Sequence, residues 1–201
     1  MVLALRPLSL EKLALMAQLP EEHRSDMNML QNFTPLHFAA YEGIGSLVKT
    51  SVDRGDSINE ADSNNCTPLM WAAKNGFPDV VELLLKSGAD QGLCTPRGLT
   101  AVFWASTNGN YRSLEKLIQN GGRVRVRDQS DCTPVYYAAA HGHIKTLGIL
   151  ITAGADVEAI HSSRTLLQTA TYCGELAVVK SCSNTMQISG SRTKKVARCS
   201  I

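Results

Sequence analysis

Thr34-Pro35-Leu36-His37-Phe38-Ala39-Ala40 is the stretch that decides the fold, because the chain contains it again at a fixed distance. Thr67-Pro68-Leu69-Met70-Trp71-Ala72-Ala73 is the second copy, a third of the same length opens at Thr133, and shorter versions open at Thr100 and Thr165. The residue numbers of successive threonines differ by 33, 33, 33 and 32. Since self-similarity at a period of about 20 to 50 residues indicates a repeat architecture, we expect an array of one structural unit.

Glycines mark the ends of two helices in each unit. One glycine stands nine positions after each threonine and another stands 21 positions after each of the first four, so nine of the fifteen glycines follow the period. A threonine hydroxyl can cap a helix, a following proline suits its first position, and glycine supplies the left-handed conformation that ends it. The pattern predicts a first helix of about two turns, a second, amphipathic helix such as the one around Val80–Leu85, and a polar, turn-rich loop such as 62–65.

This period, with a turn, two helices and the motif T-P-L-H-x-A, resembles the ankyrin-repeat family. The resemblance covers about residues 29–180 and implies an all-α solenoid with β-turn fingers, four complete repeats and one incomplete. We place the repeats near 29–61, 62–94, 95–127, 128–159 and 160–180. Asp62 and Asp128 stand where the family has its finger aspartate. Only His37 keeps the motif histidine, and the other repeats have Met70, Phe103, Tyr136 and Gln168 at this position. The hydrogen bonds that the histidine usually makes between neighbouring loops are therefore in question for those repeats.

The two ends of the array differ from its middle. Residues 1–28 include Ser9–Gln18, whose amphipathic pattern predicts a short capping helix, since a terminal repeat needs a cover. The fifth repeat loses its apolar pattern after Val179, and residues 181–201 are polar and basic, which predicts a disordered tail. These features lead to the hypothesis that the chain is a truncated or alternatively terminated form of a longer protein.

Composition limits the classes of protein to consider. Hydrophobic residues make up 44% and charged residues 19% of the 201 residues, a balance typical of a globular domain. The formal net charge is +2, and because residues 181–201 hold four cations and no acid, the rest of the chain carries −2, which argues against nucleic-acid binding. No stretch has the roughly 20 apolar residues of a membrane-spanning helix. The six cysteines show no paired spacing and no secretory signal precedes them, so we expect free thiols in a cytoplasmic, or alternatively nuclear, protein.

The resemblance implies that the finger tips and the adjoining helix ends line a concave surface that binds another protein. The candidate partner-binding residues are Ser63, Asn64, Lys74, Asn75, Arg97, Leu99, Trp104, Thr107, Asn108, Arg112, Gln129, Ser130, Tyr137 and His141. Arg97 and Arg112, together with the alternating Arg123, Arg125 and Arg127, make the third repeat basic and could meet an acidic partner surface. Taken singly, each of these residues is also consistent with a solvated loop.

Four aromatic residues form one column of the array, each four positions after its threonine: Phe38, Trp71, Trp104 and Tyr137. Packing between repeats explains such a stripe, because aromatic side chains bury large apolar areas. The alternative is partial exposure at the wall of the groove, where Trp and Tyr make strong contacts with partners. Both interpretations could hold in part.

The sequence contains none of the catalytic motifs G-x-S-x-G, phosphate-binding loop or H-E-x-x-H. The pair His141 and His143 lacks a third metal ligand, and the glycosylation sequons at Asn32 and Asn65 arise where asparagine takes the turn position of a finger. We therefore expect a non-enzymatic monomer that uses no cofactor or metal, takes no small-molecule substrate and does not insert into a membrane. It would serve as an adaptor, scaffold or inhibitor. The alternative is a targeting or regulatory part of a longer enzyme or channel.

Overall fold

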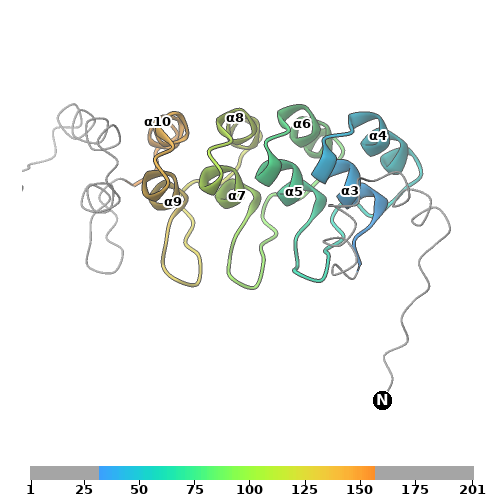
Figure 1. Ribbon diagram of the computed structural model, residues 1–201, viewed down its shortest axis with the longest axis horizontal. Coiled ribbons are helices and arrows are strands. Elements are labelled where there is room, and N and C mark those ends of the chain that lie inside the picture. Colours follow the sequence, from blue (N-terminus) through green and yellow to red (C-terminus); the bar gives the residue numbers. More distant parts are fainter. Residues whose placement is uncertain (1–31, 157–201) are drawn as a thin grey trace, which may run out of the picture.

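The computed structural model describes residues 32–156, which form eight α-helices in four consecutive pairs (Figure 1). The first helices of the pairs are α3 (Pro35–Glu42), α5 (Pro68–Asn75), α7 (Ala101–Thr107) and α9 (Pro134–Ala140). The second helices are α4 (Gly45–Asp53), α6 (Pro78–Lys86), α8 (Tyr111–Gln119) and α10 (Ile144–Thr152). No strand occurs within residues 32–156. The fold is the predicted all-α repeat solenoid.

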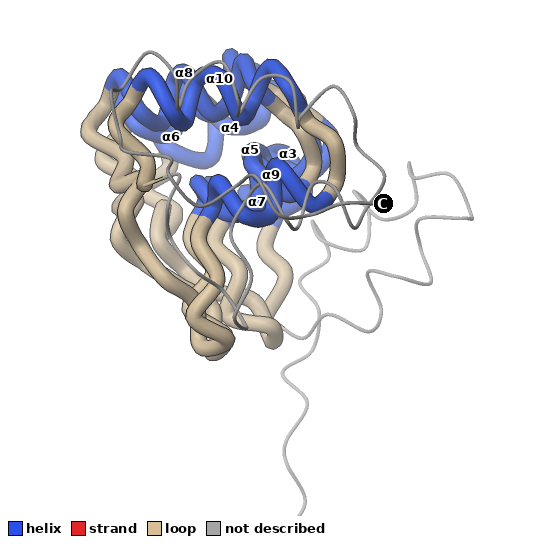
Figure 2. Tube along the Cα trace, turned by 90° about the vertical axis from the view of Figure 1, so that its left-hand side faces the viewer, coloured by secondary structure: helices blue, strands red, loops and turns tan. Residues whose placement is uncertain are grey.

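The helices stand in two rows, and the long loops that precede the first helices extend away from both. Figure 1 shows these loops, the fingers, leaving the first-helix row in one common direction. Seen along the array, the two rows lie one beside the other and the fingers project from them (Figure 2). The concave face is defined here as the surface of the fingers and of the first helices, and the outer row as α4, α6, α8 and α10. The predicted capping helix, the fifth repeat and the basic tail lie outside the described residues.

Threonine caps start most of the first helices, as predicted. The hydroxyl oxygens of Thr34, Thr67 and Thr133 each accept a hydrogen bond from the backbone N–H three positions later. The prediction is wrong for Thr100, whose hydroxyl makes no capping bond although its backbone is extended like that of the other three. Because α7 also begins with Ala101 instead of proline, the third repeat lacks both features that favour a helix start.

Left-handed backbone recurs at fixed positions of the four described repeats. The glycines of the sequence period have φ between 72° and 91°, and they are Gly43, Gly55, Gly76, Gly88, Gly109, Gly121, Gly142 and Gly154. The finger turn needs the same conformation, which Asn32, Asn65, Gly98 and Asp131 adopt at φ values from 56° to 80°. Glycine, asparagine and aspartate are the residues that enter this region most readily, so the two sequons are explained by the turn.

The core consists of columns of apolar residues, one member per repeat. Each first helix packs against the first helix of the next pair, and the outer row packs in the same way. Alanines let the first helices approach closely, and Ala39, Ala72, Ala105 and Ala138 are all 0% exposed. Leucines at one position of α6, α8 and α10, namely Leu84, Leu117 and Leu150, are equally buried. Since each column continues from repeat to repeat, the repeats bury their apolar faces only together.

The loop between the two helices of a pair also locks onto the preceding repeat. Asn110 donates hydrogen bonds to the carbonyls of Ala73 and Lys74 at 3.0 and 2.7 Å, and it fills the space beside Gly76. His143, in the fourth helix pair, lies in the same way beside Gly109 of the third pair and bonds to the Thr107 carbonyl at the end of α7. These contacts satisfy carbonyls at the ends of the first helices that no helical N–H can reach.

His37 forms the polar tie that its place in the motif predicts. Its side chain is 0% exposed, Nδ1 accepts from the Thr34 N–H at 3.2 Å and Nε2 donates to the Cys66 carbonyl at 3.0 Å. The tie joins the first two repeats. At the same position the next repeats carry Met70 and Phe103, which are buried apolar side chains, so packing replaces the hydrogen bond there.

Candidate protein-binding surface

A buried aspartate ties the second finger to the first helix of its own repeat. Asp62 Oδ1 accepts from the backbone N–H groups of Asn64 and Cys66 at 2.8 and 2.9 Å, and Oδ2 accepts from Trp71 Nε1 at 2.9 Å. Asp62 is 3% exposed. Because one carboxylate holds both the loop backbone and a helix side chain, the finger presents its tip on a rigid base.

Asp128 repeats the arrangement in the fourth finger. Its Oδ1 accepts from the backbone N–H groups of Ser130 and Cys132, and its Oδ2 accepts from the Tyr137 hydroxyl at 2.7 Å. Burial first, and then the bond to Asp128, raises the pKa of Tyr137, while the charge of Arg97 partly opposes the increase. Tyr137 therefore stays a protonated donor at neutral pH, and Arg97 lies close enough to act on it.

The third finger lacks this carboxylate. Thr95 takes the place of Asp62 and Asp128, and its hydroxyl oxygen accepts from the Leu99 N–H at 3.2 Å. Trp104, the member of the aromatic column in this repeat, has a buried Nε1 with no hydrogen-bond partner among residues 32–156. The sequence indicates this difference, because Thr95 stands at the position that Asp62 and Asp128 occupy in the neighbouring repeats. It does not show that these aspartates are hydrogen-bonded to the aromatic side chains of their repeats.

The aromatic column is core at one end and surface at the other. Phe38 and Trp71 are 7% and 8% exposed, whereas Trp104 and Tyr137 are half-buried. Lys74, at the end of α5, places its Nζ 4.4 Å from the centroid of the Trp71 ring and 5.0 Å from that of Trp104. The column thus both packs and carries a cation on the concave face, a placement that the sequence did not indicate.

The predicted partner-binding residues separate into groups. At the finger tips, five are exposed and have no side-chain hydrogen bond within the described part of the chain: Ser63, Asn64, Arg97, Gln129 and Ser130. Four use their side chains on backbone carbonyls, namely Asn75 on the preceding repeat and Thr107, Asn108 and His141 within their own helices. Lys74, Leu99, Trp104 and Tyr137 are half-buried, and Arg112 is exposed on α8. The finger tips are therefore the part of the predicted set with unused polar groups.

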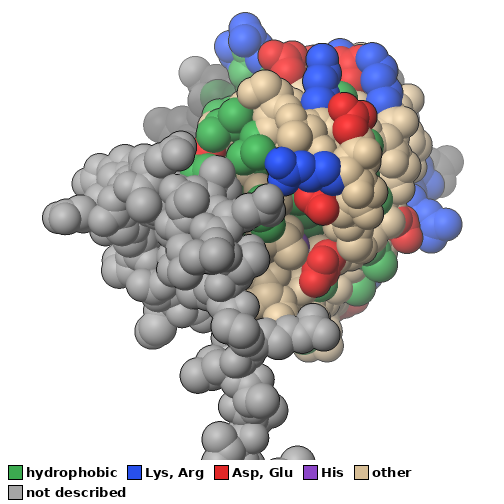
Figure 3. Space-filling model, turned by 90° about the vertical axis from the view of Figure 1, so that its right-hand side faces the viewer, with side chains coloured by type: hydrophobic (Ala, Val, Ile, Leu, Met, Phe, Trp, Pro, Cys, Tyr) green, Lys and Arg blue, Asp and Glu red, His purple; other side chains and the backbone are tan. Residues whose placement is uncertain are grey.

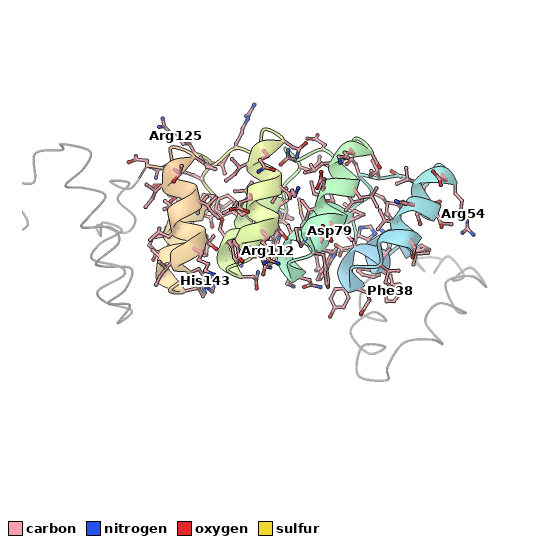
Figure 4. The ribbon with its side chains drawn as sticks, turned by 90° about the horizontal axis from the view of Figure 1, so that it is seen from above. Phe38, Arg54, Asp79, Arg112, Arg125 and His143 are labelled. Atoms are coloured by element: carbon pink, nitrogen blue, oxygen red, sulfur yellow. The ribbon has the colours of Figure 1, made fainter. Side chains whose placement is uncertain are left out.

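The arginines of the third repeat do not form one patch. Arg112 and Arg125 lie toward opposite edges of the array when it is viewed from above (Figure 4). The predicted alternation is present, because Arg123, Arg125 and Arg127 are exposed and Val124 between them is buried. However, Arg125 donates to the Gly154 carbonyl and Arg127 forms an ion pair with Asp131 at 2.7 Å. A joint contact of all these arginines with one partner surface is not supported by this arrangement.

Charge does not single out the face at the first-repeat end of the array. Figure 3 shows Lys and Arg side chains interspersed with Asp and Glu on that face, beside a smaller hydrophobic area. In the outer row, Glu82 bridges α6 and α8 through Lys116 at 2.6 Å and also contacts Lys86 at 2.8 Å. Such mixed exposed charges are typical of a solvated surface.

The outer row has an open groove of about 710 Å³ between α8 and α10. Tyr111 and Ile118 line one side, and Lys145, Gly148 and Ile149 line the other. Gly148 stands where the preceding repeats have Glu115 and Glu82, so the groove opens partly because α10 has no side chain there. The repeat pattern did not reveal this groove, since Gly148 falls outside the period.

Two of the thiols, those of Cys66 and Cys132, are buried. Cys66 and Cys94 are free, and burial followed by a neighbouring aspartate charge raises the pKa of both Cys66 and Cys132 to about 11. A thiol with such a pKa is a poor nucleophile at neutral pH. No group of three His, Cys, Asp or Glu side chains in this range could hold a metal ion, and none of its helices has the length and apolarity needed to cross a bilayer.

Comparison with known proteins agrees with this architecture. The sequence matches the family described as ankyrin repeats (3 copies) over residues 9–93 and 102–181, which together make up most of the chain. No curated protein matches the sequence. With the helix pairs, the fingers and this match taken together, the chain belongs to the ankyrin-repeat family.

Proposed function

We propose that this chain is an adaptor, scaffold or inhibitor that binds a partner protein through its concave face. Ankyrin repeats are generally protein–protein interaction modules and are typically non-catalytic. The observation that carries the proposal is the state of the finger tips. Ser63, Asn64, Gln129 and Ser130 lie on the two fingers that a buried aspartate anchors, and Arg97 lies on the third finger. The side-chain polar groups of all five are not used by any hydrogen bond within residues 32–156.

Rigid fingers favour binding because little order has to be created when a partner arrives. The Asp62 and Asp128 carboxylates fix two of the fingers to their helices through three hydrogen bonds each. Preorganised polar groups lose less conformational entropy on association than mobile ones do. Trp104 and Tyr137 add half-buried aromatic area beside the tips, of the kind that contributes most to interfaces. The free thiols of Cys66 and Cys94 fit a cytoplasmic or nuclear place of action.

The test compares a finger-tip variant with an outer-row variant. Proteins retained by the wild-type chain from cytosol are identified, purified and titrated against Arg97→Glu and Lys49→Glu. Lys49 is exposed on α4 in the outer row, so its variant carries the same charge change away from the concave face. We expect Arg97→Glu to weaken binding of a purified partner by about tenfold or more and Lys49→Glu to change it by less than about twofold.

Arg112→Glu is the third variant, because Arg112 is exposed on α8 rather than on a finger. A loss equal to that of Arg97→Glu would extend the interface to this helix. Circular dichroism of each variant keeps a folding defect apart from a binding defect. Equal affinity of wild type and Arg97→Glu for the same partner would contradict binding through the concave face.

A further inference from the structure

The first helix of the third repeat begins without the two features that start its equivalents. Proline occupies the first position of α3, α5 and α9, and a threonine hydroxyl caps each of these helices. In contrast, α7 begins with Ala101, and the Thr100 hydroxyl makes no capping bond. Because proline and a capping hydroxyl both stabilise the first turn of a helix, α7 is the least supported of the four at its start.

The end of α7 is also unfavourable for a helix. Ser106, Thr107 and Asn108 each donate a side-chain hydrogen bond to the backbone carbonyl four positions earlier, at 2.7 to 2.9 Å. Back-bonding by Ser and Thr slightly destabilises helices and often bends them. The second and fourth repeats have Ala73 and Ala139 in place of Ser106, and alanine is the best helix former.

The third finger holds its own helix less firmly than its neighbours do. The Thr95 hydroxyl accepts one hydrogen bond, from the Leu99 N–H at 3.2 Å, whereas Asp62 and Asp128 accept three each. Trp104 Nε1 is buried and has no partner among residues 32–156. Because a buried donor without an acceptor lowers stability, the third repeat loses a tie and gains a cost at the same place.

The second helix of the third repeat buries a polar group as well. Ser113 on α8 is buried, and its hydroxyl has no hydrogen-bond partner in the part of the chain that the structure describes. At the same position α6 has Val80, which buries an apolar side chain instead. Thr146 repeats the unpaired hydroxyl on α10, the next helix of the outer row. The third and fourth repeats therefore both bury a hydroxyl where the second repeat buries methyl groups.

The outer row supports the third repeat from one side more than from the other. Glu82 on α6 pairs with Lys116 on α8, but α10 has Ile149 at the position of Lys116, and no ion pair joins α8 to α10 within residues 32–156. The open groove of about 710 Å³ lies between these two helices. A Cβ at Gly148 would meet nothing within 4 Å, so neither packing nor charge closes this side.

We propose that the third repeat is a built-in weak point of the array, which opens locally while the second repeat stays folded. Each repeat is held by its own helices and by the interfaces with its neighbours, so a repeat that is weak in both respects opens at a lower free energy than the whole array does. The proposal concerns the free chain and stands whether or not the concave face binds a partner. Its consequence for the proposed function is regulation, because a partner that binds the Arg97 finger stabilises the closed form.

Native-state hydrogen exchange of the full chain, followed by NMR, tests the proposal. Leu84, Leu117 and Leu150 are matched probes, since they hold the same position in α6, α8 and α10 and are all 0% exposed. We expect the Leu117 amide to have a protection factor at least about tenfold below that of Leu84. Its protection should also depend less steeply on urea, because a local opening exposes less surface than global unfolding.

Two results would overturn the proposal. Equal protection of Leu117 and Leu84 would show that the third repeat opens only together with the second. Protection of Leu150 clearly below that of Leu117 would show that opening starts at the end of the array and not at the third repeat. Protection of Leu150 equal to or above that of Leu117 supports the third repeat as the starting point.

Ala101→Pro tests whether the start of α7 contributes to the weakness. It gives α7 the proline of the other first helices, and Thr100 already has the extended backbone that a following proline requires, with φ −93° and ψ 176°. We expect the protection factor of Leu117 to rise by about threefold and that of Leu84 to stay within about 1.5-fold. An equal rise at both amides would mean that the opening is global and would overturn the proposal.

Thr95→Asp tests the missing tie between finger and helix. It supplies the third finger with the carboxylate of the second and fourth, so Trp104 gains an internal acceptor. We expect the protection factor of Leu117 to rise by about tenfold in Thr95→Asp and not to rise in Thr95→Ala, the matched control. If Thr95→Asp does not fold, Ala101→Pro decides. Unchanged protection of Leu117 in every folded variant would overturn the assignment of the weak point to these features.

Discussion

Asp62→Asn should destabilise the array chiefly through its effect on Trp71. The asparagine oxygen can still accept from the backbone N–H groups that Asp62 Oδ1 serves, but its NH₂ group then faces Trp71 Nε1, which is itself a donor. One charge-assisted hydrogen bond is lost and two donors are buried without acceptors. With about 1.5 to 3 kcal/mol for a hydrogen bond to a charged group, we expect the free energy of unfolding to fall by about 2 to 4 kcal/mol.

A double-mutant cycle isolates that contact. Trp71→Phe removes the N–H and keeps an aromatic ring, so in this background Asp62→Asn no longer creates opposed donors. The coupling energy between the two positions should be about 1.5 to 3 kcal/mol, which is within the range for directly contacting residues. Because repeats contribute to stability together with their interfaces, loss in the second repeat should lower the stability of the whole array.

Urea unfolding followed by far-UV circular dichroism supplies the four free energies of the cycle. Asp128 and Tyr137 offer a contrast, since the Tyr137 hydroxyl donates to Asp128 but can also accept from an asparagine NH₂ group, so Asp128→Asn should cost less than Asp62→Asn. Additive effects of Asp62→Asn and Trp71→Phe, with a coupling energy below about 0.5 kcal/mol, would refute the reasoning that this aspartate anchors the finger to the helix.

Two further predictions concern packing and charge. Gly76→Ala should lower the free energy of unfolding by about 2 to 4 kcal/mol, because its φ is 79° and a Cβ would lie 2.6 Å from Asn110 Oδ1. Gly88→Ala, at φ 91° with open space around it, should lower it by about 1 to 2 kcal/mol. Equal losses in urea unfolding would contradict the role of Asn110 in joining the two repeats. Hydrogen bonds and charges, first from Lys116, lower the pKa of Glu82 to about 2. The contribution of this ion pair to stability is therefore present above the ordinary carboxyl pKa and is lost as the pH falls toward 2. An NMR titration of Glu82 should show a pKa of about 2 in the wild type and a value nearer 4.5 in Lys116→Met.

By itself the sequence determined the repeat, its helices and most of its turns. A threonine that caps, a glycine that enters the left-handed region and a regular period are local properties of the chain, so they can be read without knowing what packs where. Even the histidine tie of His37 followed from its place in the motif. Thr100 shows the limit of this reasoning, because its hydroxyl makes no capping bond although the residue type and position fit.

Only the tertiary structure decided how the surface residues are used. Finger-tip candidates such as Arg97 looked the same in the sequence as Asn75 and Arg125, yet the side chains of the latter two bond to carbonyls of other repeats. Lys74 meets Trp104 of the following repeat, and the unpaired N–H of Trp104 depends on where the Thr95 finger lies. Hydrogen bonds and ring contacts between repeats depend on distances of a few ångströms in space, which a periodic sequence does not specify.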